Sequence, residues 1–159
     1  MTKKILLRTT IGLLLVVVSL VSCRPKSTSS TQDKNNAIEI YLDSKVMQPS
    51  FGGKVFSAHK VLESDKDKFY VWALLQEYYK KDAKTLAGSG WSVPLILNIS
   101  ESQGKLTIVS HVLPRDGDLY GEDIKKLFPK EIQQQVFDFP GSVEMQKLEE
   151  LSKKRSEAL

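Results

Sequence analysis

Apolar and polar side chains alternate along the central part of the chain, which is typical of β-strands. The pattern predicts four consecutive strands, over 55–63, 69–79, 92–101 and 106–113. Short connections containing Gly, Asp and Lys favour antiparallel hairpins between them. The segment 36–47 fits both an alternating strand and a helix. We prefer the helix because Asn35 or Asn36 could cap it.

The end of the chain is predicted to be helical. Glu122 and Asp123 suit the positive end of a short helix, and Pro129 and Pro140 each suit the start of a further helix. One helix, a four-stranded antiparallel meander and C-terminal helices make an α+β fold. This order of elements resembles that of cystatin-like folds, and the resemblance implies nothing about function.

The predicted strand 69–79 is apolar on both faces, so it is expected to be central and covered on both sides. One face carries Phe69, Val71, Ala73 and Leu75, and the other carries Tyr70, Trp72, Leu74, Gln76 and Tyr78. The helix over 36–47 can cover only one of them. Either the C-terminal helices cover the other face, or that face lines a pocket rich in Tyr and Trp.

The first residues have the character of a secretory signal. Lys3, Lys4 and Arg8 give a basic start, and the run 11–20 is almost entirely aliphatic. That run is shorter than the roughly 20 apolar residues that a membrane-spanning helix needs. Export from the cytoplasm is therefore expected.

The residues Leu20-Val21-Ser22-Cys23 resemble the lipobox of bacterial lipoproteins. The resemblance implies cleavage after Ser22, diacylglycerol on the Cys23 sulfur and a fatty acid such as palmitate on the new amino group. Because two or more acyl chains give stable anchoring, the protein is expected on the outer face of the cell membrane, or on the outer membrane of a two-membrane bacterium. The alternatives are an ordinary signal peptide with a chance cysteine and an uncleaved anchor.

These features predict a signal peptide (1–22), a flexible polar tether (23–36), an α+β domain (37–139) and a C-terminal helix (140–159). Three of the 23 basic residues leave with the signal, so 20 remain against 19 acidic ones. This near-balance of charge gives no reason to expect a nucleic-acid partner. Cys23 is the only cysteine, and its lipidation leaves no thiol for a disulfide, a zinc site or a nucleophile.

The sequence contains no catalytic or metal-binding constellation, so neither an enzyme nor a cofactor is expected. His59 and His111 are the only histidines, and each lies in a predicted strand without an acid or second histidine at metal-ligand spacing. Asp116 and Asp118 do not begin a calcium loop of the EF-hand type, because Tyr120 would stand where an oxygen ligand is required. The alternatives to a binding or sensing module are a small hydrolase using His111 and Asp116, and a structural spacer at the cell surface.

Several short motifs lie between Tyr70 and Pro129: Tyr70-Val71-Trp72-Ala73-Leu74, Glu77-Tyr78, Gly90, Val93-Pro94, Pro114-Arg115-Asp116-Gly117-Asp118-Leu119-Tyr120, Asp123-Ile124-Lys125 and Phe128-Pro129. With these motifs the chain resembles extracytoplasmic domains of Gram-positive bacteria, found as lipoproteins or within membrane proteins of the metallopeptidase-type antibiotic-sensor class. The metallopeptidase segment itself is missing from the sequence. The resemblance implies a sensing or partner-binding module and supplies no catalytic residues.

A ligand or partner, either a protein or a small molecule, is expected to meet a set of aromatic and charged residues: Tyr70, Trp72, Tyr78, Trp91, Arg115, Asp116, Asp118 and Tyr120. The glycines of Gly88-Ser89-Gly90 suit a flexible loop that presents Trp91. Arg115 is expected to pair with Asp118 or Asp123 and so hold the C-terminal helices to the end of the sheet. Direct contact with a partner is its alternative role.

Overall fold

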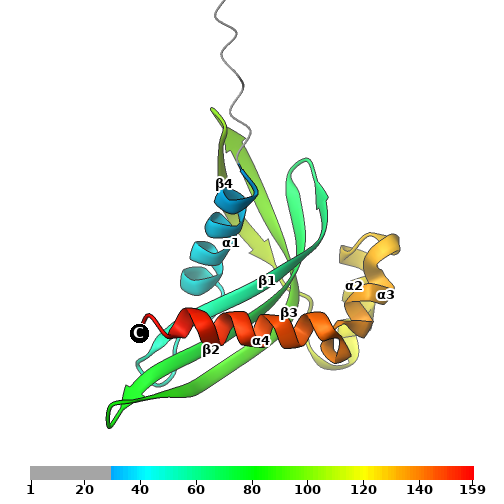
Figure 1. Ribbon diagram of the computed structural model, residues 1–159. Helices are drawn as coiled ribbons and strands as arrows, with labels where there is room; N and C mark the ends of the chain where they lie inside the picture. Colours follow the sequence, from blue (N-terminus) through cyan, green and yellow to red (C-terminus); the bar gives the residue numbers. More distant parts are fainter. Residues whose placement is uncertain (1–29) are drawn as a thin grey trace, which may run out of the picture.

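The computed structural model describes residues 30–159, arranged as Figure 1 shows. Helix α1 (Thr31–Lys45) precedes four strands, β1 (Lys54–Asp65), β2 (Lys68–Lys81), β3 (Lys84–Ser102) and β4 (Lys105–Val112). After them come the short 3-10 helices η1 (Gly117–Leu119) and η2 (Phe139–Gly141) and the α-helices α2 (Tyr120–Leu127), α3 (Lys130–Asp138) and α4 (Val143–Ser156). The predicted signal and lipobox lie outside the described residues. Among the helices from Ser30 onward, none combines the length and the apolar character needed to cross a membrane.

The four strands form one antiparallel sheet in the order β1-β2-β3-β4, which confirms the predicted α+β fold. Two-residue turns join β2 to β3 at Asp82 and Ala83, and β3 to β4 at Gln103 and Gly104. All four turn residues have positive φ, as the tightest hairpin turns require. Strand β3 begins at Lys84 and not at residue 92, so the predicted flexible loop at Gly88-Ser89-Gly90 is wrong.

The side chains beside these glycines explain why they belong to a strand. The pairing of β2 with β3 contains a β-bulge between Gln76 and Tyr78. A Cβ atom at Gly88 would lie 2.8 Å from Glu77 Oε2, and one at Gly90 would lie 2.6 Å from Gln76 Oε1. Glycine therefore lets β3 continue its pairing past two bulky polar side chains.

Helix α1 is confirmed as a helix, but it begins at Thr31, inside the segment predicted as a tether (23–36). Ser30 Oγ accepts a hydrogen bond of 3.1 Å from the N–H of Asp33, and Asp33 Oδ2 accepts one of 3.1 Å from the N–H of Ser30. This capping box satisfies two N–H groups that a helix start would otherwise leave free. The tether prediction is therefore wrong from residue 31 onward, and the rest of that segment lies outside the described residues.

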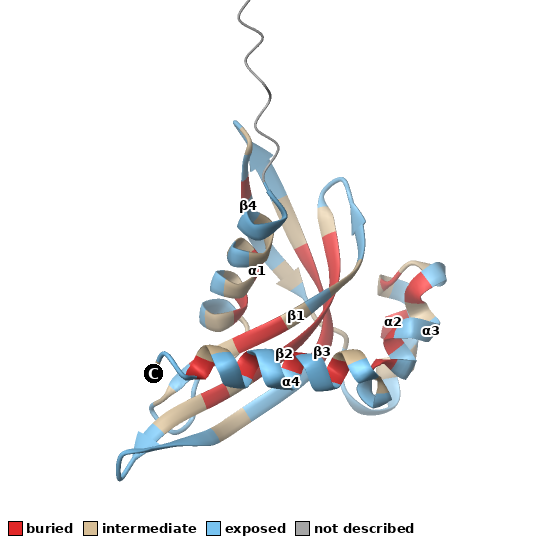
Figure 2. Ribbon diagram, in the orientation of Figure 1, coloured by how far each residue is buried: buried red, intermediate tan, exposed pale blue. Residues whose placement is uncertain are grey.

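Helices cover both faces of the sheet (Figure 1). On one face, Ile38 and Leu42 of α1 pack with four β2 residues, Phe69, Val71, Ala73 and Leu75. On the other face, Tyr70, Trp72 and Leu74 pack with Ile124, Phe128, Ile132, Val136, Phe139, Met145 and Leu148 of the C-terminal part. The alternative in which the C-terminal helices cover this face is confirmed, and burial is densest along the middle of the strands (Figure 2).

Arg155 of α4 closes the outer edge of β1. Its guanidinium lies 2.8 Å from Asp43 Oδ2 and 3.3 Å from Glu39 Oε2, both on α1, and it donates a hydrogen bond to the carbonyl of Ser57. Asp43 Oδ1 in turn accepts a hydrogen bond of 2.7 Å from the N–H of Ser57. The helices of the two faces are thus joined around this edge, and the backbone groups of Ser57 are occupied.

The carboxylate of Glu77 organises the connection between α1 and β1. Its side chain is fully buried and accepts hydrogen bonds from the N–H groups of Ser50 (2.8 Å), Phe51 (2.8 Å), Gly53 (2.9 Å) and Ser89 (3.3 Å). Burial raises the pKa of Glu77, but these hydrogen bonds to its charged form outweigh burial and lower the pKa to about 2. One side chain therefore fixes both the loop and the bulge in β3.

Arg115 pairs with Asp123, one of the two acids predicted for it. The N–H and Nε of Arg115 donate to Asp123 Oδ2 at 2.9 and 2.8 Å, and Nη2 donates to Oδ1 at 2.6 Å. The side-chain hydrogen bonds from Arg115 hold the pKa of Asp123 well below its usual range. Because Asp123 is buried at the start of α2, the pair joins the loop after β4 to the C-terminal helices.

We predict that Glu77→Gln removes an acid-sensitive part of the folding stability. The pKa of Glu77 is lower in the folded chain than the ordinary value of 4.5. Its contribution to the free energy of unfolding is therefore complete above pH 4.5 and is lost as the pH falls towards 2. Urea unfolding at several pH values should show the parent far more stable than the variant at pH 7, with the gap narrowing below pH 4.5. Glu101→Gln, which changes an exposed glutamate, is the control, and a gap independent of pH would contradict the assignment.

We predict that Arg115→Ala lowers the melting temperature of the full chain in detergent micelles by about 5–10 °C, since it leaves the buried Asp123 carboxylate without its charged donor. Thermal unfolding followed by circular dichroism measures the shift. Asp118→Asn should leave the curve in place, because Asp118 is exposed. An unchanged curve for Arg115→Ala would remove its structural role and leave contact with a partner as the better account.

Candidate functional site

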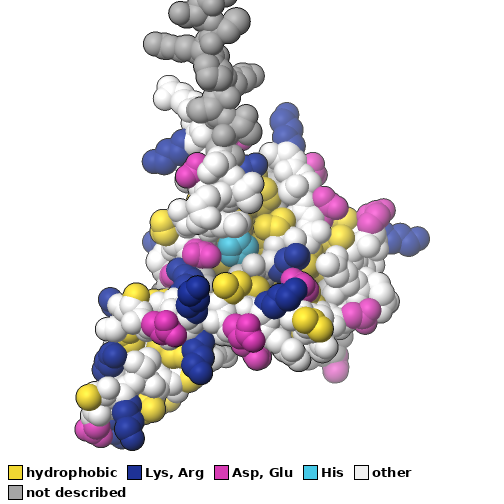
Figure 3. All heavy atoms as spheres, viewed as in Figure 1, with side chains coloured by type: hydrophobic (Ala, Val, Ile, Leu, Met, Phe, Trp, Pro, Cys, Tyr) yellow, Lys and Arg dark blue, Asp and Glu magenta, His cyan; other side chains and the backbone are white. Residues whose placement is uncertain are grey.

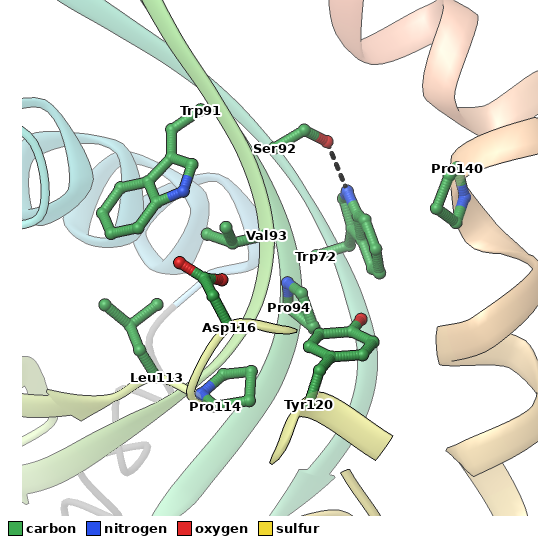
Figure 4. A pocket seen from close by; sticks show the side chains of 10 residues that line it. All are labelled: Trp72, Trp91, Ser92, Val93, Pro94, Leu113, Pro114, Asp116, Tyr120 and Pro140. Atoms are coloured by element: carbon green, nitrogen blue, oxygen red, sulfur yellow. Dashed lines mark hydrogen bonds between the residues drawn. The ribbon is translucent and has the colours of Figure 1, made fainter. Parts of the chain in front are cut away.

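A hollow of about 320 Å³ lies at the point where β4 ends. We call it the edge pocket and define it by its lining residues, Trp72, Trp91, Ser92, Val93, Pro94, Leu113, Pro114, Asp116, Tyr120 and Pro140 (Figure 4). The structure thus brings together four of the eight residues expected to meet a ligand: Trp72, Trp91, Asp116 and Tyr120.

Two prolines determine where the pocket forms. The last pair between β3 and β4 is Ile96 with Val112. Continuing this register by two residues would place Pro94 opposite Pro114, and neither proline has an N–H group for the ladder. The chain therefore diverges from β3 at the end of β4, after Val112. From Pro94 back towards the start of β3, this edge of the strand is open.

The edge pocket reaches both faces of β3. Successive side chains of a strand point to opposite faces, and four successive β3 residues, Trp91 to Pro94, line the pocket. Figure 4 shows Trp91 and Val93 on one side of the strand and Ser92 with Trp72 on the other. The pocket therefore opens onto the edge of the sheet itself.

Trp72 forms a rigid wall of the pocket. It is only 2% exposed, and its ring stacks on that of Phe139 with centroids 4.8 Å apart. Its Nε1 donates a hydrogen bond of 2.9 Å to Ser92 Oγ, which lies 3.5 Å from Met145 Sδ. Because its polar group is satisfied internally, Trp72 offers a ligand only ring surface.

Trp91 and Asp116 give the pocket its accessible chemistry. Trp91 is 36% exposed, and Asp116 is exposed and points towards Trp91 and Val93 in Figure 4. Within residues 30–159, the Asp116 carboxylate has no hydrogen bond or ion pair. A carboxylate beside an indole ring attracts a cation through both its charge and the face of the ring.

Tyr120 closes the pocket on the side of the C-terminal helices. Its ring meets that of Phe137 edge to face, with centroids 6.2 Å apart. Burial raises the pKa of its phenol, so the hydroxyl stays protonated and can donate a hydrogen bond.

The other four expected residues lie elsewhere. Tyr70 is a core residue, 8% exposed, and does not line the edge pocket. Tyr78 meets Phe56 edge to face at 6.1 Å, outside the lining of the pocket. Asp118 is exposed on η1. The Arg115 guanidinium is engaged by Asp123.

The two histidines lie apart from the edge pocket. His111 Nδ1 is 3.0 Å from the hydroxyl of Tyr41, and no hydrogen bond joins it to Asp116 in the described part of the chain. His59 is partly buried, and its Nδ1 has no hydrogen-bond partner among residues 30–159. Burial and then the charge of Arg155 lower the pKa of His59 to about 4. No three His, Cys, Asp or Glu residues from Ser30 onward are grouped to hold a metal ion.

Sequence reasoning missed the residues that shape the pocket. Pro94 and Pro114 were read as part of a motif, but their meeting depends on the β3–β4 register. Leu113 and Pro140 also line the pocket, and nothing in the sequence marks the end of a predicted strand or the start of a predicted helix as part of a pocket. A usable signal was present in Pro94, since a proline within a predicted strand marks an edge.

Comparison of the chain with protein-family models, with curated proteins and with solved structures finds no match.

Proposed function

We propose that this protein is a lipid-anchored, extracytoplasmic binding module whose binding site is the edge pocket. The observation that carries the proposal is the carboxylate of Asp116, which is unpaired within residues 30–159 and lies beside the exposed indole of Trp91 at the rim of a mainly apolar hollow. Such a combination suits a ligand group with an apolar body and a positively charged end.

The size of the pocket supports a small group rather than a large ligand. Its volume of about 320 Å³ is at the lower end of small-molecule sites. An amine carrying one aromatic or branched aliphatic group would fill it, as would one side chain of a larger partner. Prolines and aromatic rings form most of its walls, so little side-chain freedom is lost when they order around a ligand.

Binding, rather than catalysis, is favoured by the state of the pocket's polar groups. Ser92 Oγ, the only pocket hydroxyl besides that of Tyr120, accepts the hydrogen bond from Trp72. No histidine is among the residues that line the pocket. Ser92 therefore has no imidazole beside it in the pocket to act as the general base that activates a serine nucleophile.

The anchor is tested by labelling with a radioactive fatty acid in a bacterium that expresses the full chain. We expect label on the parent and none on Cys23→Ala, because the lipobox implies that this sulfur and the adjoining amino group carry the acyl chains. Ser22→Ala keeps a small residue before the cut and should still be labelled. Equal labelling of parent and Cys23→Ala, or an unlabelled parent, would exclude lipidation at Cys23.

The site is tested by titrating the full chain, in detergent micelles, with phenethylamine while following tryptophan fluorescence. We expect a dissociation constant of millimolar order and about tenfold weaker binding by Asp116→Asn, which removes the negative charge. Trp91→Ala should weaken binding similarly, through loss of the indole face.

Phenylacetate has a similar apolar body and the opposite charge, so it should bind far more weakly than phenethylamine. Asp118→Asn is the matched variant, since it removes a nearby exposed acid that does not line the pocket. If Asp116→Asn and Asp118→Asn have the same effect, the assignment of the edge pocket is wrong.

A further inference from the structure

The edge of β3 is open over residues 84–93. Strand β2 pairs with β3 from Lys84 to Asn98, but β4 pairs only with residues from Ile96 onward. The open segment is largely exposed, with Trp91 and Leu86 among its accessible side chains. By contrast, Asp43 and Arg155 occupy the backbone groups at Ser57 on the β1 edge. Within this edge, the carbonyls of Gly88 and Ser89 accept hydrogen bonds from Gln76, and the N–H of Ser89 donates to Glu77. The other backbone groups that point away from β2 have no partner within residues 30–159, so they are open to a further strand.

The direction of these backbone groups follows from two observations. The N–H of Ile99 donates to the carbonyl of Asp67, on the β2 side. Alternate residues of a strand direct their backbone groups to the same side, so those of Ser92 and Gly90 point away from β2. Pro94, which has no N–H, stands in the same alternation, as a proline at an open edge must.

We infer that this edge binds an extended peptide segment of a partner, which adds to the sheet as a strand and places its first residue in the edge pocket. The inference rests on the proposed function, because it uses the same pocket and names its ligand. Antiparallel pairing with β3 continues the line of β4, so the segment begins at the pocket and runs towards the β2–β3 turn. Its amino group then lies at Asp116 and its first side chain lies against Trp91.

The charges along the edge complement such a peptide. Asp116, at the pocket end, suits a positive group. Lys80, Lys81 and Lys84 are exposed at the opposite end, around the β2–β3 turn, where Figure 3 shows basic side chains beside hydrophobic ones at the lower left. The segment that fits is therefore positive at its amino end, apolar and β-branched in its middle, and acidic at its carboxyl end.

The test uses the synthetic peptide Leu-Thr-Val-Thr-Val-Glu-Glu with a free amino terminus, and the full chain in detergent micelles. We expect the peptide to bind at least tenfold more tightly than phenethylamine and to shift the backbone amide resonances of residues 84–93. N-acetylation of the peptide and Asp116→Asn should each weaken binding about tenfold. Replacing the two glutamates of the peptide by glutamines should weaken it less.

Strand pairing is tested by methylating the peptide nitrogens in two alternate sets. Only one of the two sets of nitrogens can face β3. One methylated peptide should therefore bind no more tightly than phenethylamine, and the other should keep its higher affinity. Equal effects of the two sets would overturn strand addition. Strand addition by a partner would also be overturned if sedimentation showed that the chain forms a dimer through the same edge and that adding the peptide does not dissociate this dimer.

The two proposals fail in different ways. If phenethylamine binds through Asp116 and Trp91 but the peptide gains nothing over it, the edge pocket stands and strand addition is wrong. If the peptide binds by one alternate set of amides and neither Trp91→Ala nor Asp116→Asn affects any ligand, the pocket is wrong and the stated position of the first residue fails with it.

Discussion

Strand β2 has two apolar faces, and the need to cover both is the constraint on which the rest of the structure depends. Burying a large apolar side chain contributes about 1.5–3 kcal/mol, and β2 buries seven successive residues from Phe69 to Leu75. One helix cannot cover both faces. The chain therefore places α1 before the sheet and α2, α3 and α4 after it. Arg155, which contacts both Glu39 and Asp43, joins the two layers at the β1 edge.

The elements that sequence reasoning predicted well are those that burial defines. The alternation over 69–79 gave β2 and both of its faces. The same alternation did not reveal the first half of β3. Residues such as Thr85 and Gly90 are exposed and are held by backbone pairing, so the sequence there shows no alternation of apolar and polar residues. It placed the start of α1 too late because the capping residues Ser30 and Asp33 lie within a polar run that reads as a tether.

The candidate site was predicted in part for similar reasons. Residue type and local motif singled out Trp91, Asp116 and Tyr120, which do line one pocket. The role of Pro114 depends on its register with Pro94, which no local pattern contains. Glu77 was read only as part of a strand motif. Its importance arises because the loop around Phe51 folds back and directs N–H groups at the carboxylate.

The early start of α1 affects how the domain would search for partners. Six residues lie between Cys23 and Ser30, and the seven steps from one Cα to the next span at most about 25 Å at full extension. If Cys23 carries the lipid, the domain is confined to a thin layer beside the membrane. Another membrane protein in that layer is then met at an effective concentration of millimolar order. A site whose intrinsic affinity is weak can be occupied under those conditions, and it releases its ligand when the two proteins diffuse apart.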